Sequence, residues 1–158
     1  VIDAVLYYKK SYSNIYLVGF SMGATLCLDI SKNESISGVV GMSTFIGLRS
    51  KIAKYILYAS SLLKIKMLPR LLQSTSNKTK NEVDNPNILP VLETNLMCKE
   101  ASQLLDGNKQ LDCNTLLIHS IDDKVADYAK VKELKLIHNN VKLITLRNLN
   151  HLIQYNFT

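Results

Sequence analysis

Residues 19–23 (GFSMG) constrain the fold of this chain more than any other segment, because they place the pattern G-x-S-x-G between two kinds of structure. The preceding residues 14–20 (NIYLVGF) form an apolar run that is too short for a buried helix and rich in branched and aromatic side chains, which predicts a strand. Residues 22–30 carry small and apolar side chains at helical spacing, and residues 31–33 (SKN) predict the end of that helix. The pattern therefore predicts a strand, a tight turn and a helix.

The same alternation continues along the chain. Residues 1–12 predict a short amphipathic helix, and residues 127–138 predict another. Residues 36–44 (ISGVVGMST) and 115–121 (TLLIHSI) predict buried strands, whereas residues 141–147 (VKLITLR) alternate like a strand with one wetter face. This order predicts an α/β fold with a mostly parallel sheet, in which the run NIYLVGF is covered on both faces.

Residues 46–113 interrupt the alternation within a single domain that spans residues 1–158. Helices are expected at residues 52–63, 68–73 and 96–105, separated by a polar, breaker-rich stretch at residues 74–87. We interpret the segment as a helical cap inserted over the strand ends. Lysines accompany its apolar residues, so the cap either packs its apolar face on the domain, which we favour, or rests on an anionic lipid surface. These lysines are Lys51, Lys54, Lys64 and Lys66.

Composition excludes several classes of protein. The net charge of +6 comes from lysines that are interleaved with acidic residues. The sequence has no basic run with interleaved aromatic residues, so these charges favour a solvated surface over a nucleic-acid site. Cys27, Cys98 and Cys113 are odd in number and lack CxxC spacing, which predicts neither a disulfide framework nor a zinc site but buried thiols in a reducing, cytoplasmic compartment. No apolar run approaches the ~20 residues that span a bilayer.

The chemistry of the GFSMG turn centres on Ser21. A serine at the tip of such a turn is held in a strained backbone conformation that exposes its hydroxyl, and close chain segments are expected to leave room only for glycine at Gly19 and Gly23. The N–H of Met22 at the helix start can stabilise a developing oxyanion. The alternative is a plain turn whose glycines serve packing only.

A serine hydroxyl needs a histidine to accept its proton and a carboxylate to orient that histidine. When the serine follows an early strand, the acid is expected after a later strand and the histidine after the next one. Asp122 and Asp123 follow residues 115–121, and His151 follows residues 141–147. His119 lies inside a predicted strand and His138 at a helix end, so His151 is the candidate base. An isolated loop histidine would be a bystander, but the matching order favours a site.

Three segments resemble the monoacylglycerol lipase, lysophospholipase and carboxylesterase branch of the α/β-hydrolases, also similar to serine aminopeptidases. Residues 14–30 resemble the nucleophile elbow, residues 111–134 the acid segment and residues 141–153 the histidine loop. The resemblance implies a triad of Ser21, Asp123 and His151. It favours Asp123 because the family has His-Gly, two residues and then the acid, although another register would select Asp122. Ser120 replaces the usual glycine, Asn114 a frequent proline and Ala24 a frequent third glycine.

The resemblance also implies a partial α/β-hydrolase fold, because the family has further strands before the elbow and a loop there that gives the second oxyanion donor. Strand 14–20 then becomes a bare hydrophobic edge, which predicts pairing with the missing N-terminal half or self-association. The implied activity is hydrolysis of a small-molecule acyl ester without metal or organic cofactor. Alternatives are a thioesterase, acyltransferase or peptidase on the same triad, or an impaired remnant that serves as a binding module.

Overall fold

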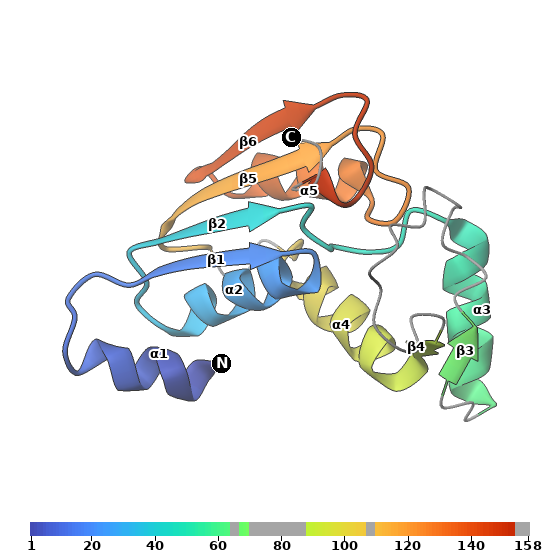
Figure 1. Cartoon of the computed structure of the whole chain (residues 1–158), viewed down its shortest axis with the longest axis horizontal. Helices are drawn as coiled ribbons and strands as arrows, with labels where there is room; N and C mark the ends of the chain where they lie inside the picture. The colour runs from blue at the N-terminus through green and yellow to red at the C-terminus, as the bar shows by residue number, and fades with distance from the viewer. Residues whose placement is uncertain (64–66, 70–87, 107–109, 154–158) are drawn as a thin grey trace, which may run out of the picture.

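The computed structural model describes residues 1–63, 67–69, 88–106 and 110–153, and its centre is a four-stranded parallel sheet (Figure 1). The strands follow the order β1-β2-β5-β6, and each pairs in parallel with its neighbour. Their bounds are β1 (Tyr16–Phe20), β2 (Gly38–Met42), β5 (Asn114–Ser120) and β6 (Val141–Leu146). The predicted α/β class with a parallel sheet is therefore confirmed.

Three helices connect these strands or precede them: α1 (Ile2–Lys9), α2 (Met22–Asn33) and α5 (Tyr128–Ile137). Helix α2 packs against β1 and β2, and α5 packs against β5 and β6. The carboxylate of Asp127 accepts the N–H of Ala129 at 3.1 Å and so caps the start of α5. Helix α2 ends at Asn33, within residues 31–33 that were predicted to end it, and Lys32 in its last turn complements the helix dipole.

The hydrophobic core lies between the helices and one face of the sheet. Its members include Leu28 from α2, Val39 from β2, Leu117 from β5 and Val131 from α5, all buried. Burial of each such side chain contributes about 1.5–3 kcal/mol. This packing fixes the strand ends relative to one another. Of the three free cysteines, Cys27 and Cys113 are buried as predicted, whereas Cys98 is only half-buried.

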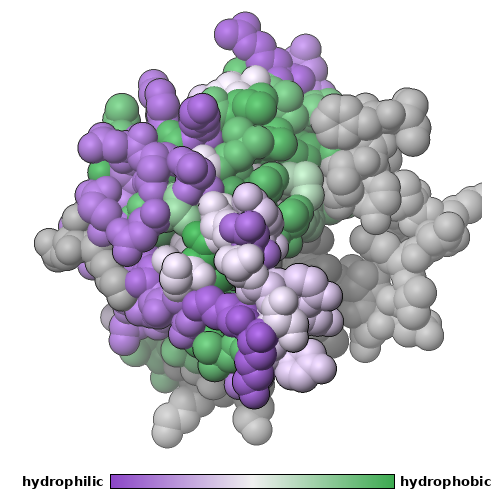
Figure 2. Space-filling view, turned by 90° about the vertical axis from the view of Figure 1, so that its left-hand side faces the viewer, coloured by the Kyte–Doolittle hydropathy of each residue, from purple (hydrophilic) through white to green (hydrophobic). Residues whose placement is uncertain are grey.

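Part of the opposite face of the sheet is exposed, contrary to the prediction that β1 is covered on both faces. Tyr16 and Val18 of β1 remain 69% and 65% exposed, and Ile144 of β6 remains 47% exposed. Strand register aligns Val18 with Val40, so apolar side chains follow one another across the sheet. Figure 2, which views the molecule from the left-hand side of Figure 1, shows hydrophobic residues gathered in the upper part of that side. Parallel sheets normally bury both faces.

The segment between β2 and β5 contains α3 (Lys51–Leu62), β3 (Met67–Pro69), β4 (Ile88–Pro90) and α4 (Val91–Gln103). Strands β3 and β4 form an antiparallel pair, α3 packs against α4, and α4 also contacts α2. Figure 1 shows α3, β3 and β4 beyond the carboxyl ends of the sheet strands. None of the helices in the described part of the chain is long and apolar enough to cross a bilayer.

Two predictions for this segment need correction. Residues 67–69 form a strand where a helix over 68–73 was predicted, and residues 70–73 lie outside the described residues, as do Lys64, Lys66 and the polar stretch 74–87. The apolar face of the cap was expected, in the favoured alternative, to pack on the domain, yet Ile52 and Ile56 of α3 are exposed. The helix instead buries Ala53 and Leu57, which lie four residues apart on the face turned to the rest of the chain.

Candidate active site

Ser21 occupies a tight turn between the end of β1 and the start of α2. Its backbone has φ 52° and ψ −120°, a region that residues other than glycine rarely adopt, so the predicted strain of the turn is confirmed. The N–H of Ser21 donates to the carbonyl of Met42 at 2.9 Å, and the carbonyl of Ser21 accepts from the N–H groups of Ala24 and Phe45 at 3.1 and 3.2 Å. These contacts fix the turn at the carboxyl end of the sheet.

The two glycines beside Ser21 differ in their packing. A Cβ atom on Gly19 would lie 2.5 Å from the Cα and N atoms of Ala24, so only glycine fits there, as predicted. A Cβ atom on Gly23 would meet nothing within 4 Å. The prediction that close packing also requires glycine at position 23 is therefore wrong, because Gly23 lies on the outer side of the first turn of α2, away from β1.

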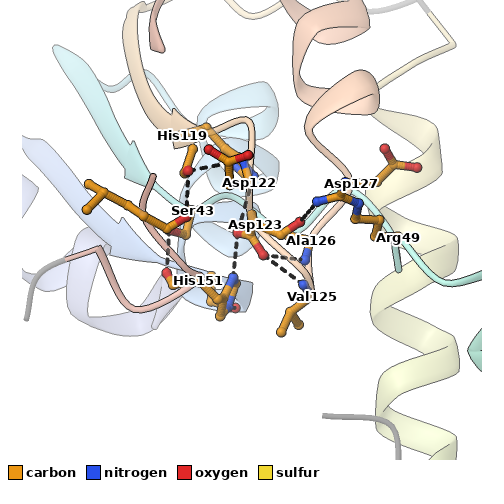
Figure 3. A network of polar contacts seen from close by, with 12 residues as sticks. Ser43, Arg49, His119, Asp122, Asp123, Val125, Ala126, Asp127 and His151 are labelled. Carbon is orange, nitrogen blue, oxygen red and sulfur yellow. Dashed lines mark hydrogen bonds and ion pairs between the residues drawn. The ribbon is translucent and has the colours of Figure 1, made fainter. Parts of the chain in front are cut away.

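His151 joins two residues that are far away in the sequence. Its Nε2 atom lies 2.8 Å from Oγ of Ser21, and its Nδ1 atom lies 2.7 Å from Oδ2 of Asp123. Ser21 follows β1, Asp123 follows β5 and His151 follows β6, so all three stand at the carboxyl ends of parallel strands. Figure 3 shows the imidazole of His151 directed toward Asp123. The structure thus brings together the three residues that the sequence singled out.

The two adjacent acids have separate partners. The Asp123 side chain is fully buried, and its Oδ1 atom accepts the N–H groups of Val125 at 2.8 Å and Ala126 at 3.0 Å, which leaves Oδ2 for His151 (Figure 3). Asp122 instead accepts the N–H of Asn148 at 2.6 Å through Oδ2. Asp123 rather than Asp122 is therefore the acid in contact with the histidine.

The surroundings of Asp123 keep it ionised. Burial alone raises the pKa of this carboxyl, but its contacts with His119 and His151 and the N–H of Val125 outweigh burial and hold the pKa well below its usual range. A permanently charged carboxylate stabilises the positive charge that His151 acquires when it accepts a proton. The side chain of His151 is 13% exposed and Ser21 is half-buried, so both residues keep some contact with solvent.

Two serines that the sequence did not single out as site residues hold the loop that carries His151. The hydroxyl of Ser43 donates to the carbonyl of His151 at 2.6 Å, and the hydroxyl of Ser120 donates to the carbonyl of Leu149 at 2.6 Å. Both serines are fully buried, and Ser43 has a positive φ of 45°. Ser120 had been noted only as a replacement for glycine. Its position two residues before Asp122, at the end of the predicted strand, was the one sequence signal that could have pointed to a role.

A third contact fixes the loop of Asp123 from the other side. The guanidinium of Arg49 donates to the carbonyl of Asp123, and the N–H of Arg49 donates to the carbonyl of Val125 at 3.0 Å. Leu48 forms an antiparallel bridge with Ala126. The chain that follows β2 therefore clamps the acid loop, a long-range contact that no local sequence pattern indicates.

Two further observations concern the binding of an oxyanion and of a metal ion. Met22 opens α2, so its N–H has no acceptor within that helix and is available to an oxyanion. Within residues 1–63, 67–69, 88–106 and 110–153, no three His, Cys, Asp or Glu side chains are grouped as a metal ion requires.

Comparison with known proteins identifies the fold. No protein-family model and no curated protein sequence matches the chain. Among solved structures, it is similar to a monoacylglycerol lipase from Paleococcus ferrophilus, with a TM-score of 0.75 and 14% identity over 96% of this chain and 65% of the lipase. A soluble variant of monoglyceride lipase from Saccharomyces cerevisiae gives a TM-score of 0.73 and 14% identity, over 96% of this chain and 59% of the lipase.

An α/β-hydrolase enzyme from the metagenome of lagoon sediments in Morocco gives a TM-score of 0.58 and 15% identity over 99% of this chain and 60% of its own. The chain thus spans 59–65% of the length of these three structures. At such identities the likeness concerns the fold, and it agrees with the parallel order β1-β2-β5-β6 and the turn at Ser21. The chain therefore has the fold of the α/β-hydrolase superfamily, over part of that fold.

Proposed function

We propose that this chain is the catalytic portion of a serine hydrolase that cleaves carboxylic esters. The observation that carries the proposal is the continuous hydrogen-bonded series from Oγ of Ser21 through His151 to Asp123, with lengths of 2.8 and 2.7 Å. These lengths fall within the reach required for proton transfer between a nucleophile and its base. The strained backbone of Ser21 supports the proposal, because strain of this kind costs about 1–3 kcal/mol and gathers at functional sites.

The proposed reaction follows from this arrangement. Nε2 of His151 accepts the proton of Ser21 while Oγ attacks the ester carbonyl carbon, and the N–H of Met22 stabilises the resulting oxyanion. Collapse of this intermediate breaks the bond to the alcohol, which leaves with the proton from His151, and the acyl group stays on Oγ. Water then loses a proton to His151 and attacks the acyl carbon, the bond from that carbon to Oγ breaks to release the acid, and His151 returns the proton to Oγ of Ser21.

We further propose an acylglycerol, lysophospholipid or similar acyl ester as substrate. Two of the structural neighbours described above are named as monoacylglycerol or monoglyceride lipases. Residues 46–113 would act as the cap, and the exposed apolar residues Ile52 and Tyr55 of α3 support its contact with an acyl chain or a lipid surface. Of the lysines considered for such a surface, Lys51 is exposed. Lys54 instead forms an ion pair within the chain, in which its Nζ atom lies 3.9 Å from Oδ2 of Asp127.

A thioester, amide or acyl-transfer reaction uses the same triad and remains the enzymatic alternative, since the geometry around Ser21 does not select a leaving group. We also propose that further polypeptide covers the outer edge of β1 and the open face of the sheet, supplied by the same protein or by a second copy of the chain. The exposure of Tyr16 and Val18 supports this proposal.

A fluorophosphonate probe tests the catalytic proposal, because it forms a covalent bond only with an activated serine. We expect the wild-type chain to be labelled, Ser21→Ala to lose labelling, and the exposed control Ser102→Ala on α4 to keep it. Circular dichroism should show that all three proteins are folded. A folded wild-type chain that resists labelling would contradict an enzyme and favour a binding module, and labelling that persists in Ser21→Ala would assign the nucleophile elsewhere.

A further inference from the structure

The imidazole of His119 is a buried polar group whose hydrogen-bonding capacity is unused. His119 lies near the end of β5 and is fully buried, and neither of its ring nitrogens makes a hydrogen bond within the described part of the chain. Buried polar side chains nearly always have a partner, so an exception of this kind needs an explanation. The imidazole ring also lies 6.0 Å from the ring of Tyr128, measured between centroids.

The nearest charged atom to this imidazole belongs to the proposed triad. Nε2 of His119 lies 3.3 Å from Oδ2 of Asp123, without the alignment of a hydrogen bond. Oδ2 is the same oxygen that Nδ1 of His151 contacts at 2.7 Å. Because two backbone N–H groups hold Oδ1, the position and charge of Oδ2 depend on the two imidazoles. Two histidines therefore share one carboxylate oxygen.

We propose that His119 is a positioning residue that holds Oδ2 of Asp123 through its Nε2–H. This contact also reduces the negative charge that Oδ2 presents to His151. The role rests on the proposed function of Ser21, Asp123 and His151. His119 does not touch the substrate or the reacting atoms, and it acts through Asp123. The contact requires a proton on Nε2, so that the imidazole presents an N–H to Oδ2.

Titratable and charged groups reach this cluster from three other elements. Tyr128 at the start of α5 faces the ring of His119, and its hydroxyl pairs with Thr145 of β6 at 2.9 Å. Arg49, from the chain after β2, contacts the carbonyl of Asp123 rather than its carboxylate. His151 approaches from the loop after β6. Among these groups, His119 is the one besides His151 that contacts the carboxylate oxygen Oδ2.

Loss of the His119 N–H leaves more negative charge on Oδ2 for His151. A stronger attraction between this carboxylate and the imidazolium favours the protonated form of His151. We therefore expect His119→Phe, which fills a similar volume without an N–H, to raise the pH at which His151 loses its proton. His119→Gln retains an N–H donor and is expected to restore most of the wild-type behaviour.

NMR titration of the imidazole signals tests this directly in the full chain, which has only three histidines. The matched control is His138→Phe, because His138 is equally buried but contacts the carbonyl of Leu104 and the side chain of Gln110 instead. In His119→Phe we expect the His151 midpoint to rise by about half a pH unit, which is roughly a threefold change in its proton affinity. In His138→Phe and His119→Gln we expect a midpoint close to that of the wild type.

An unchanged or lowered His151 midpoint in His119→Phe overturns the proposal, and so does an equal shift in His138→Phe, which indicates a merely structural effect. The titration needs no catalysis, so its result is independent of the labelling of Ser21. If the chain hydrolyses esters, the acid limb of kcat/KM should move in the same direction while KM stays nearly constant. If the His151 midpoint shifts but Ser21 is never labelled, the titration supports the role of His119. The missing label then contradicts only the proposed function.

Discussion

Gly19 lies so close to Ala24 that a methyl group in place of its hydrogen would come within 2.5 Å of the Ala24 Cα and N atoms. Gly19 belongs to β1 and Ala24 to the first turn of α2, so this contact sets how closely the helix approaches the strand. Real Cβ atoms do not approach backbone atoms so closely. The turn that presents Ser21 therefore depends on the absence of a side chain at position 19.

The first prediction compares Gly19→Ala with Gly23→Ala. Forcing a methyl group into the packed contact at Gly19 should lower the free energy of unfolding by about 1–3 kcal/mol or more and abolish fluorophosphonate labelling. Gly23 lies in a helix with open space around it, so alanine there should be neutral or stabilise the chain by up to about 1 kcal/mol. Urea unfolding followed by circular dichroism measures both. Equal stability of the two variants would contradict the geometry of the turn.

The second prediction separates the two adjacent acids. Asp123→Asn should reduce the rate of labelling or ester hydrolysis by about 10²- to 10⁴-fold, because an amide neither fixes the tautomer of His151 nor stabilises its cation. Asp122→Asn should reduce it much less, since Asp122 contacts the N–H of Asn148 and not the histidine. Rates of phosphonate labelling measure both variants. A larger loss in Asp122→Asn would assign the acid to the other position.

The residues of the site could be predicted because their local setting is visible in the sequence. Ser21 stands between a strand-like run and a helical one, and Asp123 and His151 each follow a strand of a parallel sheet. The carboxyl ends of parallel strands meet at one edge, so predicting the strands also predicts which loops come together. The order of these segments and the α/β class follow from the same periodicity.

The features that could not be predicted depend on contacts between distant segments or on which surface is covered. The hydroxyls of Ser43 and Ser120 bind loop carbonyls more than 25 residues away. Exposed Val18 carries an apolar side chain that sequence alone assigns to a buried strand. Likewise, α3 has apolar residues around most of its circumference, so periodicity did not reveal that Ala53 and Leu57 form its buried side.

The third prediction concerns the two serines that hold the histidine loop. Ser43→Ala or Ser120→Ala leaves a carbonyl of that loop without its donor, which costs about 1–3 kcal/mol. Because the position of His151 relative to Ser21 is then less restricted, we expect labelling to slow by roughly tenfold, given that about 1.4 kcal/mol corresponds to a factor of ten. Ser31→Ala is the control, since its buried hydroxyl binds Leu28 within α2. A similar slowing in the control would show that general loss of stability is the cause.

The fourth prediction follows from the lowered pKa of Asp123. A carboxyl whose pKa is lower in the folded state stabilises the fold fully above its unfolded pKa of about 3.9, and this contribution is lost as the pH falls through the folded pKa. The difference in the free energy of unfolding between the wild type and Asp123→Asn should therefore be largest at pH 6, where this carboxylate contribution is fully present. Urea unfolding should show the margin shrinking below about pH 4. A margin that stays constant down to pH 2 would contradict the favourable contacts of the buried carboxylate.

The last prediction concerns the open sheet. Tyr16 and Val18 leave the outer part of β1 apolar and exposed, and an exposed apolar strand at a sheet edge pairs readily with another chain. Light scattering should therefore find the isolated chain associated or poorly soluble. Val18→Lys should increase the monomer fraction, because a charge on the open face opposes burial of that face. Tyr55→Lys on α3 serves as the matched control, since Tyr55 is 74% exposed but lies outside the sheet. A monodisperse wild-type monomer would contradict the proposed cover of β1, and an equal gain from Tyr55→Lys would place the contact on α3 instead.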